Sequence, residues 1–570
     1  MASSNERTVA EAIVGGLLRH GVDTMFSQSL PSAVLLAAED AGIKQYSYRT
    51  ENAGTAMADG YARISGKVGV VTAQNGPAAT LLVPGLAEAL KASIPIVALV
   101  QEVNRNQTDR NAFQELDHIG LFQSCTKWVR KVTDADRVLD YLDMAFATAC
   151  TGRPGPVVLL LPADLLLETF PEDDAGERNA SLGTFPLDRT VADPSKIAEA
   201  ADLLASARRP LIVAGGGVHI SGAAQEVSKL QEIAYLPVMT TVMGKGAVDE
   251  RHPLSLGVTG YILGRLAPGR HLRSLIDEAD VILLIGTRTN QNGTDSWSLY
   301  PSGAKYIHLD VDGSEIGRNY EALRLAGDAK LTLIELTKAL AGRRTRNTAV
   351  EDFIAKARAQ HAEDMKPTLQ RAGGAARPER IMADMQTVLT PDTIVVTDAS
   401  YSSVWMASYL RCEAAGARFV SPRGLAGLGW GLPMALGAKR ARPSAPVLCI
   451  VGDGGFAHVW SELETAKRMQ TNLVLTVLNN GILGYQKHAE NSKFGRHTTA
   501  CYFEPVDHAR VAIACGCNGV RVECADEYLP ALRKAMKSDV PTVIDVITDP
   551  DAYPPVTLFD RLSTSSDHGA

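Results

Sequence analysis

The stretch "VGDGGFAHVWSELETAKRMQTNLVLTVLNNG", residues 451–481, contains two apolar strand-like runs separated by a helix-like segment. The first run ends in Gly-Asp-Gly and the second in Asn-Asn. In a βαβ unit the carboxyl ends of neighbouring parallel strands meet at one edge of the sheet, where ligands of open α/β sheets bind. We therefore expect Asp453 and Asn480 to lie side by side at such an edge.

The side chains at this edge suit a metal ion. A carboxylate directly after a buried strand is poorly solvated unless a positive group neutralises it. Asp453, the amide oxygen of Asn480 and a nearby backbone carbonyl form an oxygen-only ligand set of the kind that binds Mg²⁺. The adjacent glycines let backbone N–H groups approach a phosphate. The stretch predicts a metal ion that holds a diphosphate; the alternative is that Asp453 only caps the helix.

Similar alternations of strands and helices run along the whole chain and predict an α/β protein with three doubly wound parallel-sheet domains. The run at 68–100 repeats the strand, glycine turn, helix and strand plan of 445–480, which indicates an internal duplication of fold. Between them, buried strands are predicted within 208–218, 280–291 and 304–312.

The expected domains are 1–180, which would bind a pyrimidine, 190–345, of nucleotide-binding type, and 370–548, which would bind the diphosphate. Charge, Gly and Pro indicate linkers at 171–196 and 342–380. The tail, 549–570, is too irregular for a core element, so it is expected to be disordered or to form a flap over the active site.

Composition excludes several classes of protein. Hydrophobic residues make up 45% of the chain and the net charge is −7, so nucleic acid is not an expected partner. Eight cysteines are too few for a disulfide scaffold, and Cys515 and Cys517 are expected to be buried thiols. The amino terminus lacks the features of a signal peptide and no segment is apolar enough to cross a membrane. A cytoplasmic protein is expected.

The pattern of GDG, helix, apolar strand and Asn-Asn at this spacing resembles the thiamine-diphosphate-binding motif of the pyruvate-oxidase and acetolactate-synthase-like enzymes. The resemblance extends over essentially the whole chain. It implies that Asp453, Asn480 and the backbone carbonyl of Ile482 bind Mg²⁺. Further residues implied at the cofactor are Asn75, Gly452, Gly454, Gly455 and Gly484.

Two more segments carry the resemblance. In "TENAGTAMADGYARISG" (50–66), the family's glutamate is Glu51, whose carboxylate would hydrogen-bond the cofactor pyrimidine and favour its reactive tautomer; alone, Glu51 would be read as a surface residue in a helix's first turn. In "SPRGLAGLGWGLPMALGA" (421–438), Ala426 would contact the pyrimidine through its backbone and Leu428 would wedge beneath the cofactor. A glycine-rich packing site is the alternative there.

The resemblance also implies an oligomer and a second cofactor. In such enzymes the glutamate reaches a cofactor held by another subunit, so a homodimer is the minimum and a homotetramer is expected. The central domain holds FAD, ADP or nothing in this family. The residues implied at a nucleotide are Gly216, Arg288, Asp310 and Asp328.

The residues that would face the substrate depart from the common pattern. The usual histidine before the glutamate is Thr50 here, and Gln28 presents an uncharged amide. Gln114 falls where related enzymes carry a glutamine near the reacting carbon. The segment 481–500 resembles that of bacterial 2-hydroxyacyl-CoA lyases, which implies that Glu490 is the acid/base serving the substrate hydroxyl. Alternatively, Glu490 lies in a solvated loop and pairs with a lysine.

The resemblance therefore implies a thiamine-diphosphate-dependent carbon–carbon lyase that acts on a 2-hydroxyacyl-CoA and yields formyl-CoA with a ketone or aldehyde such as acetone. The alternative is an acetolactate synthase that joins two pyruvates and holds FAD. Third is a decarboxylase of oxalyl-CoA or a 2-oxo acid. A non-catalytic nucleotide sensor is disfavoured because Glu51, Asp453 and Asn480 are all present.

Overall fold

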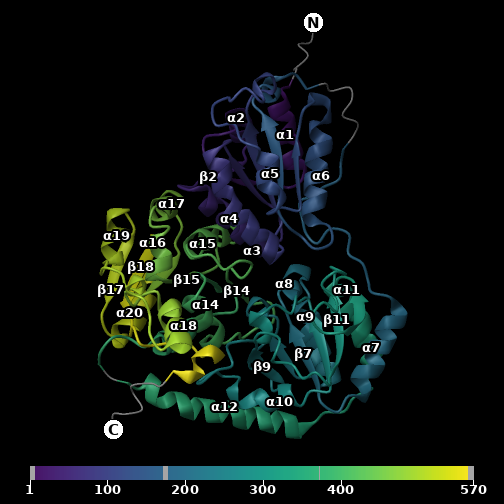
Figure 1. Ribbon diagram of the computed structural model, residues 1–570, viewed down its shortest axis with the longest axis vertical. Helices are drawn as coiled ribbons and strands as arrows, with labels where there is room; N and C mark the ends of the chain where they lie inside the picture. Colours follow the sequence, from purple (N-terminus) through teal and green to yellow (C-terminus); the bar gives the residue numbers. More distant parts are fainter. Residues whose placement is uncertain (1–6, 171–177, 372, 563–570) are drawn as a thin grey trace.

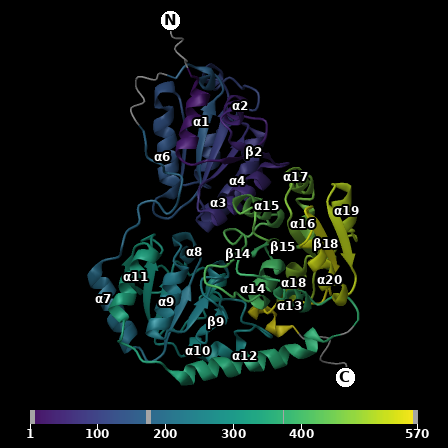
Figure 2. The ribbon, with the colours of Figure 1, turned by 180° about the vertical axis from the view of Figure 1, so that it is seen from behind.

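The computed structural model describes residues 7–170, 178–371 and 373–562. It contains three six-stranded parallel sheets, each flanked by helices. In Figures 1 and 2 the first domain lies at the top and the other two lie side by side beneath it. The predicted fold class, α/β with three doubly wound parallel sheets, is confirmed.

Domain I has the strand order β2-β1-β3-β4-β6-β5. Its strands are β1 (Thr24–Ser27), β2 (Lys44–Ser47), β3 (Gly69–Ala73), β4 (Ile96–Glu102), β5 (Trp128–Lys131) and β6 (Val157–Pro162). Its α-helices are α1 (Val9–Arg19), α2 (Ser32–Asp40), α3 (Glu51–Ser65), α4 (Pro77–Ala92), α5 (His118–Gln123) and α6 (Val138–Cys150). Helices cover both faces of the sheet, so its central strands β3 and β4 are buried and mostly apolar.

Domain III has the order β14-β13-β15-β16-β18-β17, which repeats the topology of domain I and confirms the predicted duplication of fold. Its strands are β13 (Ile394–Thr397), β14 (Arg418–Val420), β15 (Val447–Gly452), β16 (Val474–Asn479), β17 (Asn518–Val522) and β18 (Thr542–Ile547). Its α-helices are α13 (Pro378–Gln386), α14 (Tyr401–Tyr409), α15 (Gly431–Ala441), α16 (Asp453–Ala457), α17 (Glu462–Arg468), α18 (Gly484–Phe494), α19 (His508–Ala514) and α20 (Ala525–Ala535).

Domain II has a different order, β12-β11-β10-β7-β8-β9, which is that of dinucleotide-binding folds. Its strands are β7 (Pro210–Ala214), β8 (Val238–Thr240), β9 (Ser255–Val258), β10 (Val281–Ile285), β11 (Lys305–Asp310) and β12 (Ala322–Ala326). Its α-helices are α7 (Pro194–Ser206), α8 (Gly217–Ser221), α9 (Ala224–Ala234), α10 (Arg273–Asp277) and α11 (Ala329–Leu340). The order reverses between β7 and β10, so a ligand crevice is expected at the carboxyl ends of these two strands.

The predicted linker at 342–380 is mostly helix. It contains α12 (Thr348–Leu369), which runs beneath domains II and III (Figure 1). Few of its residues are buried, among them Ile354 and Met365. Most of the helix surface faces solvent, which explains why the segment is rich in charged residues.

The prediction that the tail holds no core element is wrong for residues 549–562. The 3₁₀ helix η9 (Thr557–Arg561) lies there, and Ala552, Val556 and Phe559 are buried against domain III. The apolar residues of this segment follow neither the helix nor the strand period, so the sequence pattern did not reveal that the segment is packed. Residues 1–6, 171–177, 372 and 563–570 lie outside the described residues, and with them the rest of the tail and part of the linker at 171–196.

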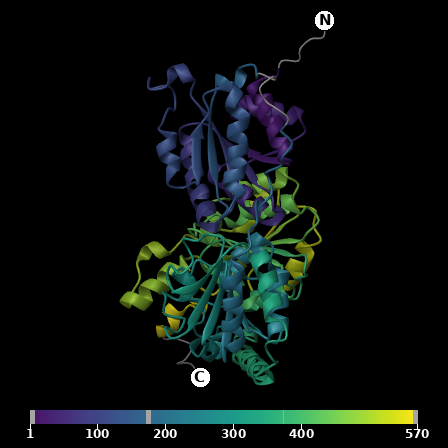
Figure 3. The ribbon, with the colours of Figure 1, turned by 90° about the vertical axis from the view of Figure 1, so that its right-hand side faces the viewer.

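Within the described part of the chain, no helix is long and apolar enough to span a membrane. Cys517 is buried as predicted, whereas Cys515 is half-buried. Figure 3 shows domain I seated above the other two domains, so both lower domains meet it at its base.

Candidate functional site

The carboxyl edge of the domain III sheet gathers the residues of the GDG and Asn-Asn motifs. They line one cavity of about 60 Å³. Strand order changes direction between β13 and β15, and Asp453 follows β15 directly as the first residue of α16. The cavity-lining residues predicted for the cofactor are Leu428, Gly452, Asp453, Gly454, Gly455, Asn480, Ile482 and Gly484.

Asp453 is a buried carboxyl without a cation beside it. Its Oδ2 accepts the backbone N–H of Gly481 at 2.8 Å, which ties the two strand ends together. It forms no ion pair within the described residues, and burial raises its pKa to about 6. Asn480 Oδ1 accepts the N–H of Ile482 at 3.2 Å, and the Ile482 carbonyl lies in the same loop. A carboxylate, an amide oxygen and a carbonyl at one strand edge therefore fit a Mg²⁺ ion, which would supply the missing positive charge.

Other side chains in the cavity were not singled out from the sequence. Tyr401, at the start of α14, lines it, and a Cβ on Gly484 would lie 2.8 Å from the Tyr401 ring, so glycine lets α18 begin there. Asp398, directly after β13, accepts the N–H groups of Gly429 (2.9 Å) and Trp430 (3.1 Å) and thereby positions the loop that carries Leu428. A polar residue at a strand end was the signal that could have found Asp398.

The carboxyl edge of the domain I sheet gathers the other predicted residues. Gln28 follows β1, Glu51 is the first residue of α3 after β2, Asn75 follows β3 and Gln114 lies beyond β4. These four strands are neighbours in the sheet. Glu51 is buried, so the alternative of a surface residue is wrong, and burial raises the pKa of its carboxyl.

An amide network joins this edge. The Gln74 side chain donates to Gln114 Oε1, and Asn75 Nδ2 donates to the Gln114 carbonyl oxygen at 3.1 Å. The side-chain amide of Asn75 is thus engaged by the backbone of Gln114 and holds that segment in place. None of the four residues Gln28, Glu51, Asn75 and Gln114 lines the domain III cavity of the same chain. The structure therefore forms two groups of site residues on two separate sheet edges.

The loop that contains Ala426 is held by domain I, a feature that the sequence did not reveal. The carboxylate of Glu88, on α4, accepts the backbone N–H groups of Gly424 (2.7 Å), Leu425 (2.6 Å) and Ala426 (3.0 Å). Ala426 has φ of +62°, so three hydrogen bonds offset a backbone strain. Nothing in local sequence links residue 88 to residue 426.

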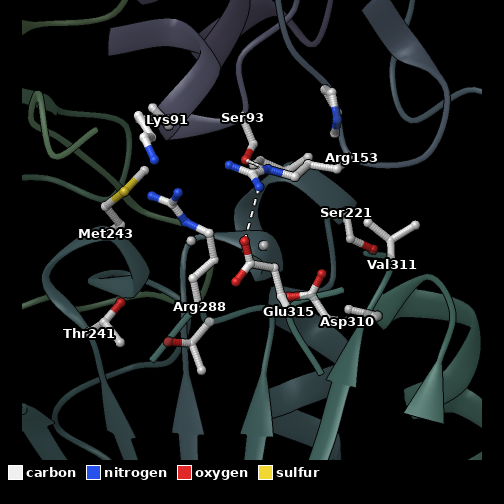
Figure 4. Close-up of a pocket in the computed structure, with 18 of the residues that line it drawn as sticks. Lys91, Ser93, Arg153, Ser221, Thr241, Met243, Arg288, Asp310, Val311 and Glu315 are labelled. Carbon is white, nitrogen blue, oxygen red and sulfur yellow. Dashed lines mark hydrogen bonds and ion pairs between the residues drawn. The ribbon is translucent and has the colours of Figure 1, made fainter. Parts of the chain in front are cut away.

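A larger cavity, of about 300 Å³, lies where all three domains meet (Figure 4). It opens at the reversal point between β7 and β10. All four residues predicted for a nucleotide, Gly216, Arg288, Asp310 and Asp328, line it. Gly286, directly after β10, lies against Gly217, the first residue of α8; a Cβ on either would come within 2.7 Å of the other's Cα, so both positions need glycine.

Some charged side chains in this cavity are paired with one another, and others are not. Arg288 forms no hydrogen bond or ion pair within the described residues, whereas Arg153 Nη1 pairs with Glu315 at 3.2 Å (Figure 4). Burial raises the pKa of Asp310 to about 6. Asp328 is already engaged, because it caps α11 and pairs with Arg189 at 2.9 Å. The free guanidinium suits a phosphate, and the Asp310 carboxyl suits ribose hydroxyls.

Glu490 lines neither of these two cavities. It is on α18, where Oε1 accepts the Gln486 side-chain N–H at 2.6 Å and Oε2 accepts the backbone N–H of Thr498 at 2.7 Å. These two hydrogen bonds lower its pKa. Lys487 pairs with Asp551 instead, at 3.0 Å. Glu490 is not among the described residues that line the domain III cavity.

The chain matches three family models in the order of its domains. Residues 7–121 match the thiamine pyrophosphate enzyme N-terminal TPP binding domain, 197–336 the central domain, and 398–546 the C-terminal TPP binding domain. Thiamine pyrophosphate is another name for thiamine diphosphate. These matches show that the chain belongs to the thiamine-pyrophosphate-dependent enzymes. The oxygen ligands at the sheet edge of domain III and the buried Glu51 of domain I agree with this class.

Within that class the chain belongs to the acetolactate-synthase-like family. It is 34% identical over 563 residues to the probable acetolactate synthase large subunit of Methanococcus aeolicus, covering 95% of this chain and 92% of the relative. A similarly named protein of Methanocaldococcus jannaschii is 34% identical, with 97% and 94% covered. Acetolactate synthase isozyme 2 large subunit of Escherichia coli (strain K12) is 30% identical, with 95% of both chains covered. None of these names points to a 2-hydroxyacyl-CoA lyase.

Proposed function

We propose that this chain is a thiamine-diphosphate- and Mg²⁺-dependent enzyme that joins two 2-oxo acids, with pyruvate as the substrate to test first. The support is similarity over nearly the full length to proteins named acetolactate synthase large subunits. This is the alternative that the sequence left open, and it replaces cleavage of a 2-hydroxyacyl-CoA as the preferred activity.

The observation that carries this choice is the position of Glu490. The lyase reading needed its carboxyl as an acid/base for a substrate hydroxyl. Both of its oxygens instead accept hydrogen bonds, one from Gln486 on the same helix and one from Thr498 in the loop that follows α18. A condensation of 2-oxo acids makes no demand on this residue.

The residues have the following proposed roles. When bound, thiamine diphosphate supplies a nucleophilic carbon that adds to a carbonyl. Asp453, Asn480 and the Ile482 carbonyl hold Mg²⁺, and Glu51 shares a proton with the cofactor pyrimidine. Because Asp453 and Glu51 lie on different sheet edges of one chain, we propose that Glu51 serves the cofactor of a second subunit, which makes a homodimer the minimal active unit and a homotetramer the expected one.

Gln28 and Gln114 lie on the same sheet edge as Glu51 and are proposed to face the substrate. Their amide groups can donate hydrogen bonds to the carboxylate or carbonyl oxygen of a 2-oxo acid. Neither can exchange a proton near neutral pH, so we assign them to binding and orientation.

Purified protein is incubated with thiamine diphosphate and Mg²⁺, once with pyruvate and once with 2-hydroxyisobutyryl-CoA, and the products are separated by chromatography. We expect acetolactate from pyruvate and no formyl-CoA from the thioester. Glu490→Gln should keep at least about half of the activity, whereas Glu51→Gln should lose about 100-fold or more. Formyl-CoA from the thioester, together with inert pyruvate, would restore the lyase reading.

A further inference from the structure

Glu462 joins domain III to the segment of domain I that precedes Glu51. It is the first residue of α17 and is completely buried. Its Oε1 accepts the backbone N–H of Arg49 at 2.9 Å and that of Thr50 at 3.3 Å. One carboxylate oxygen of domain III therefore holds the two residues that lead into Glu51.

These two hydrogen bonds fix the start of α3. Thr50 is the N-cap residue, with an extended backbone (φ −135°, ψ 147°), and its own side chain makes no capping hydrogen bond. The direction in which α3 begins thus depends on the peptides at residues 49 and 50. Glu51 is the next residue, so a shift of these peptides moves its carboxyl.

Glu462 is a buried carboxyl at the contact between domains I and III, and its hydrogen-bond donors from domain I are uncharged. Its hydrogen bonds from Arg49 and Thr50 come from neutral backbone groups, and burial raises its pKa. The nearby arginines pair elsewhere: Arg49 and Arg468 both bind the half-exposed Glu464. Burying a carboxyl costs free energy, which an apolar contact would avoid.

The charges of Glu462 and Glu51 also act on one side chain, that of Tyr48. Burial and then the charges of Glu51 and Glu462 raise the pKa of Tyr48, whose hydroxyl donates to the Thr72 carbonyl oxygen at 2.5 Å. Tyr48 in turn lies against α3, where a Cβ on Gly54 would come within 2.2 Å of the ring. The start of α3 is therefore fixed from two sides.

We propose that Glu462 is a positioning residue for Glu51: it sets the place of the Glu51 carboxyl through the backbone of Arg49 and Thr50. This inference rests on the proposed function only in that Glu51 must meet the cofactor pyrimidine. It also links two parts of the machinery, because α17 follows α16, which begins with Asp453.

The test needs no substrate. Exchange of the cofactor's C2 proton for deuterium is followed by NMR on enzyme loaded with thiamine diphosphate and Mg²⁺, and cofactor affinity is measured by calorimetry. Glu462→Ala should slow exchange about 10- to 100-fold, the loss that a shift of about 1 Å in a catalytic group produces. Glu462→Gln keeps an oxygen acceptor for both N–H groups and should stay within about 3-fold of wild type.

Glu527→Ala is the control, because it removes an exposed carboxylate from the first turn of α20, another helix of domain III, and should leave exchange unchanged. The decisive measurement is a double-mutant cycle with Glu51→Gln. If Glu462 acts through Glu51, Glu462→Ala slows exchange little further in the Glu51→Gln background.

Three results would overturn the proposal: full-rate exchange in Glu462→Ala, equal losses in Glu462→Gln and Glu462→Ala, or independent losses in the double variant. Thermal unfolding of each variant shows whether it is folded. If Glu462→Ala does not fold, the exchange rate of Glu462→Gln is compared with that of wild type, and a loss of more than about 3-fold contradicts the proposal. Exchange that is normal in the wild type but accompanied by no product from pyruvate would overturn the proposed substrate and leave the role of Glu462 standing.

Discussion

His488 is a buried histidine that packs among aromatic side chains. A hydrogen bond of 2.6 Å joins its Nδ1 to the hydroxyl of Tyr401, and the two rings stack with 5.8 Å between their centres. Phe559 and Tyr553 of the tail pack against the same imidazole. Burial lowers its pKa to about 4, so protonation would place a charge in an aromatic cluster next to the cofactor cavity.

This residue predicts a loss of stability in mild acid. Its pKa is about 4 in the folded protein, below the value of about 6.5 in an unfolded chain, so the unfolded state takes up the proton first. Stability should therefore fall as the pH drops below about 6.5, by at most about 1.4 kcal/mol per pH unit for this group, and the effect should end near pH 4. Urea unfolding at pH 7 and pH 5 measures it.

His488→Gln should make the pH dependence shallower, whereas His271→Gln, which removes an exposed histidine paired with Asp364, should not. Two further histidines, the half-buried His219 and the buried His308, have pKa values that desolvation lowers to about 3 and about 4, so they contribute in the same direction and remain in both variants. An unchanged slope in His488→Gln would mean that His488 is not neutral in the folded protein.

At the scale of elements, helices α3 and α15 form the main contact between domains I and III. They approach closely because small residues face each other: a Cβ on Gly60 would lie 2.2 Å from the Met434 carbonyl oxygen, and one on Gly437 only 1.9 Å from that of Met57. Their apolar residues belong to one core that extends across both domains. The helix that begins with Glu51 is thereby fixed to the domain that carries Asp453.

Gly437→Ala should destabilise this contact by about 1–3 kcal/mol, because backbone atoms rather than flexible side chains must move. Calorimetric melting should show an earlier transition. Gly15→Ala is the control: Gly15 lies on the exposed side of α1, its nearest contact would be 3.6 Å away, and alanine there should stabilise by up to about 1 kcal/mol. Equal melting of the Gly437→Ala variant and wild type would contradict the packing argument.

At the scale of the whole molecule, the central cavity is the place where all three domains meet. Domain I contributes Lys91 and Arg153, domain II the strand ends with Arg288 and Asp310, and domain III the segment at 423–426 (Figure 4). A ligand bound there would contact every domain and stabilise the whole chain by mass action.

We expect protein purified without added nucleotide to release FAD or ADP when it is denatured, and the absorption spectrum with chromatography identifies which one. Arg288→Ala should weaken binding about 10- to 100-fold, because it removes a charged hydrogen-bond donor from a phosphate. Arg273→Ala, which removes a half-exposed arginine of α10 paired with Asp277 outside the cavity, is the control and should bind as wild type does. Arg288→Ala binding as tightly as wild type would place the phosphate elsewhere.

The local pattern of the sequence was sufficient to locate several central strands and to predict which residues lie at their ends. Apolar runs flanked by glycine and polar residues located β3, β4, β7, β10, β11, β15 and β16, and Asp453 and Asn480 meet where the βαβ plan requires. The packed tail and α12 were missed because one lacks a helix or strand period and the other is mostly solvent-exposed.

The sequence by itself determined the α/β class, the duplicated plan of domains I and III, and the chemistry of each strand end, since these follow from local periodicity and residue type. Tertiary structure alone decided which strand ends share a cavity, that Gln486 and Thr498 hydrogen-bond to Glu490, and that Glu88 and Glu462 hold segments more than 300 residues away in the chain. Such contacts depend on how separate domains dock, and docking leaves no periodic signal along the chain.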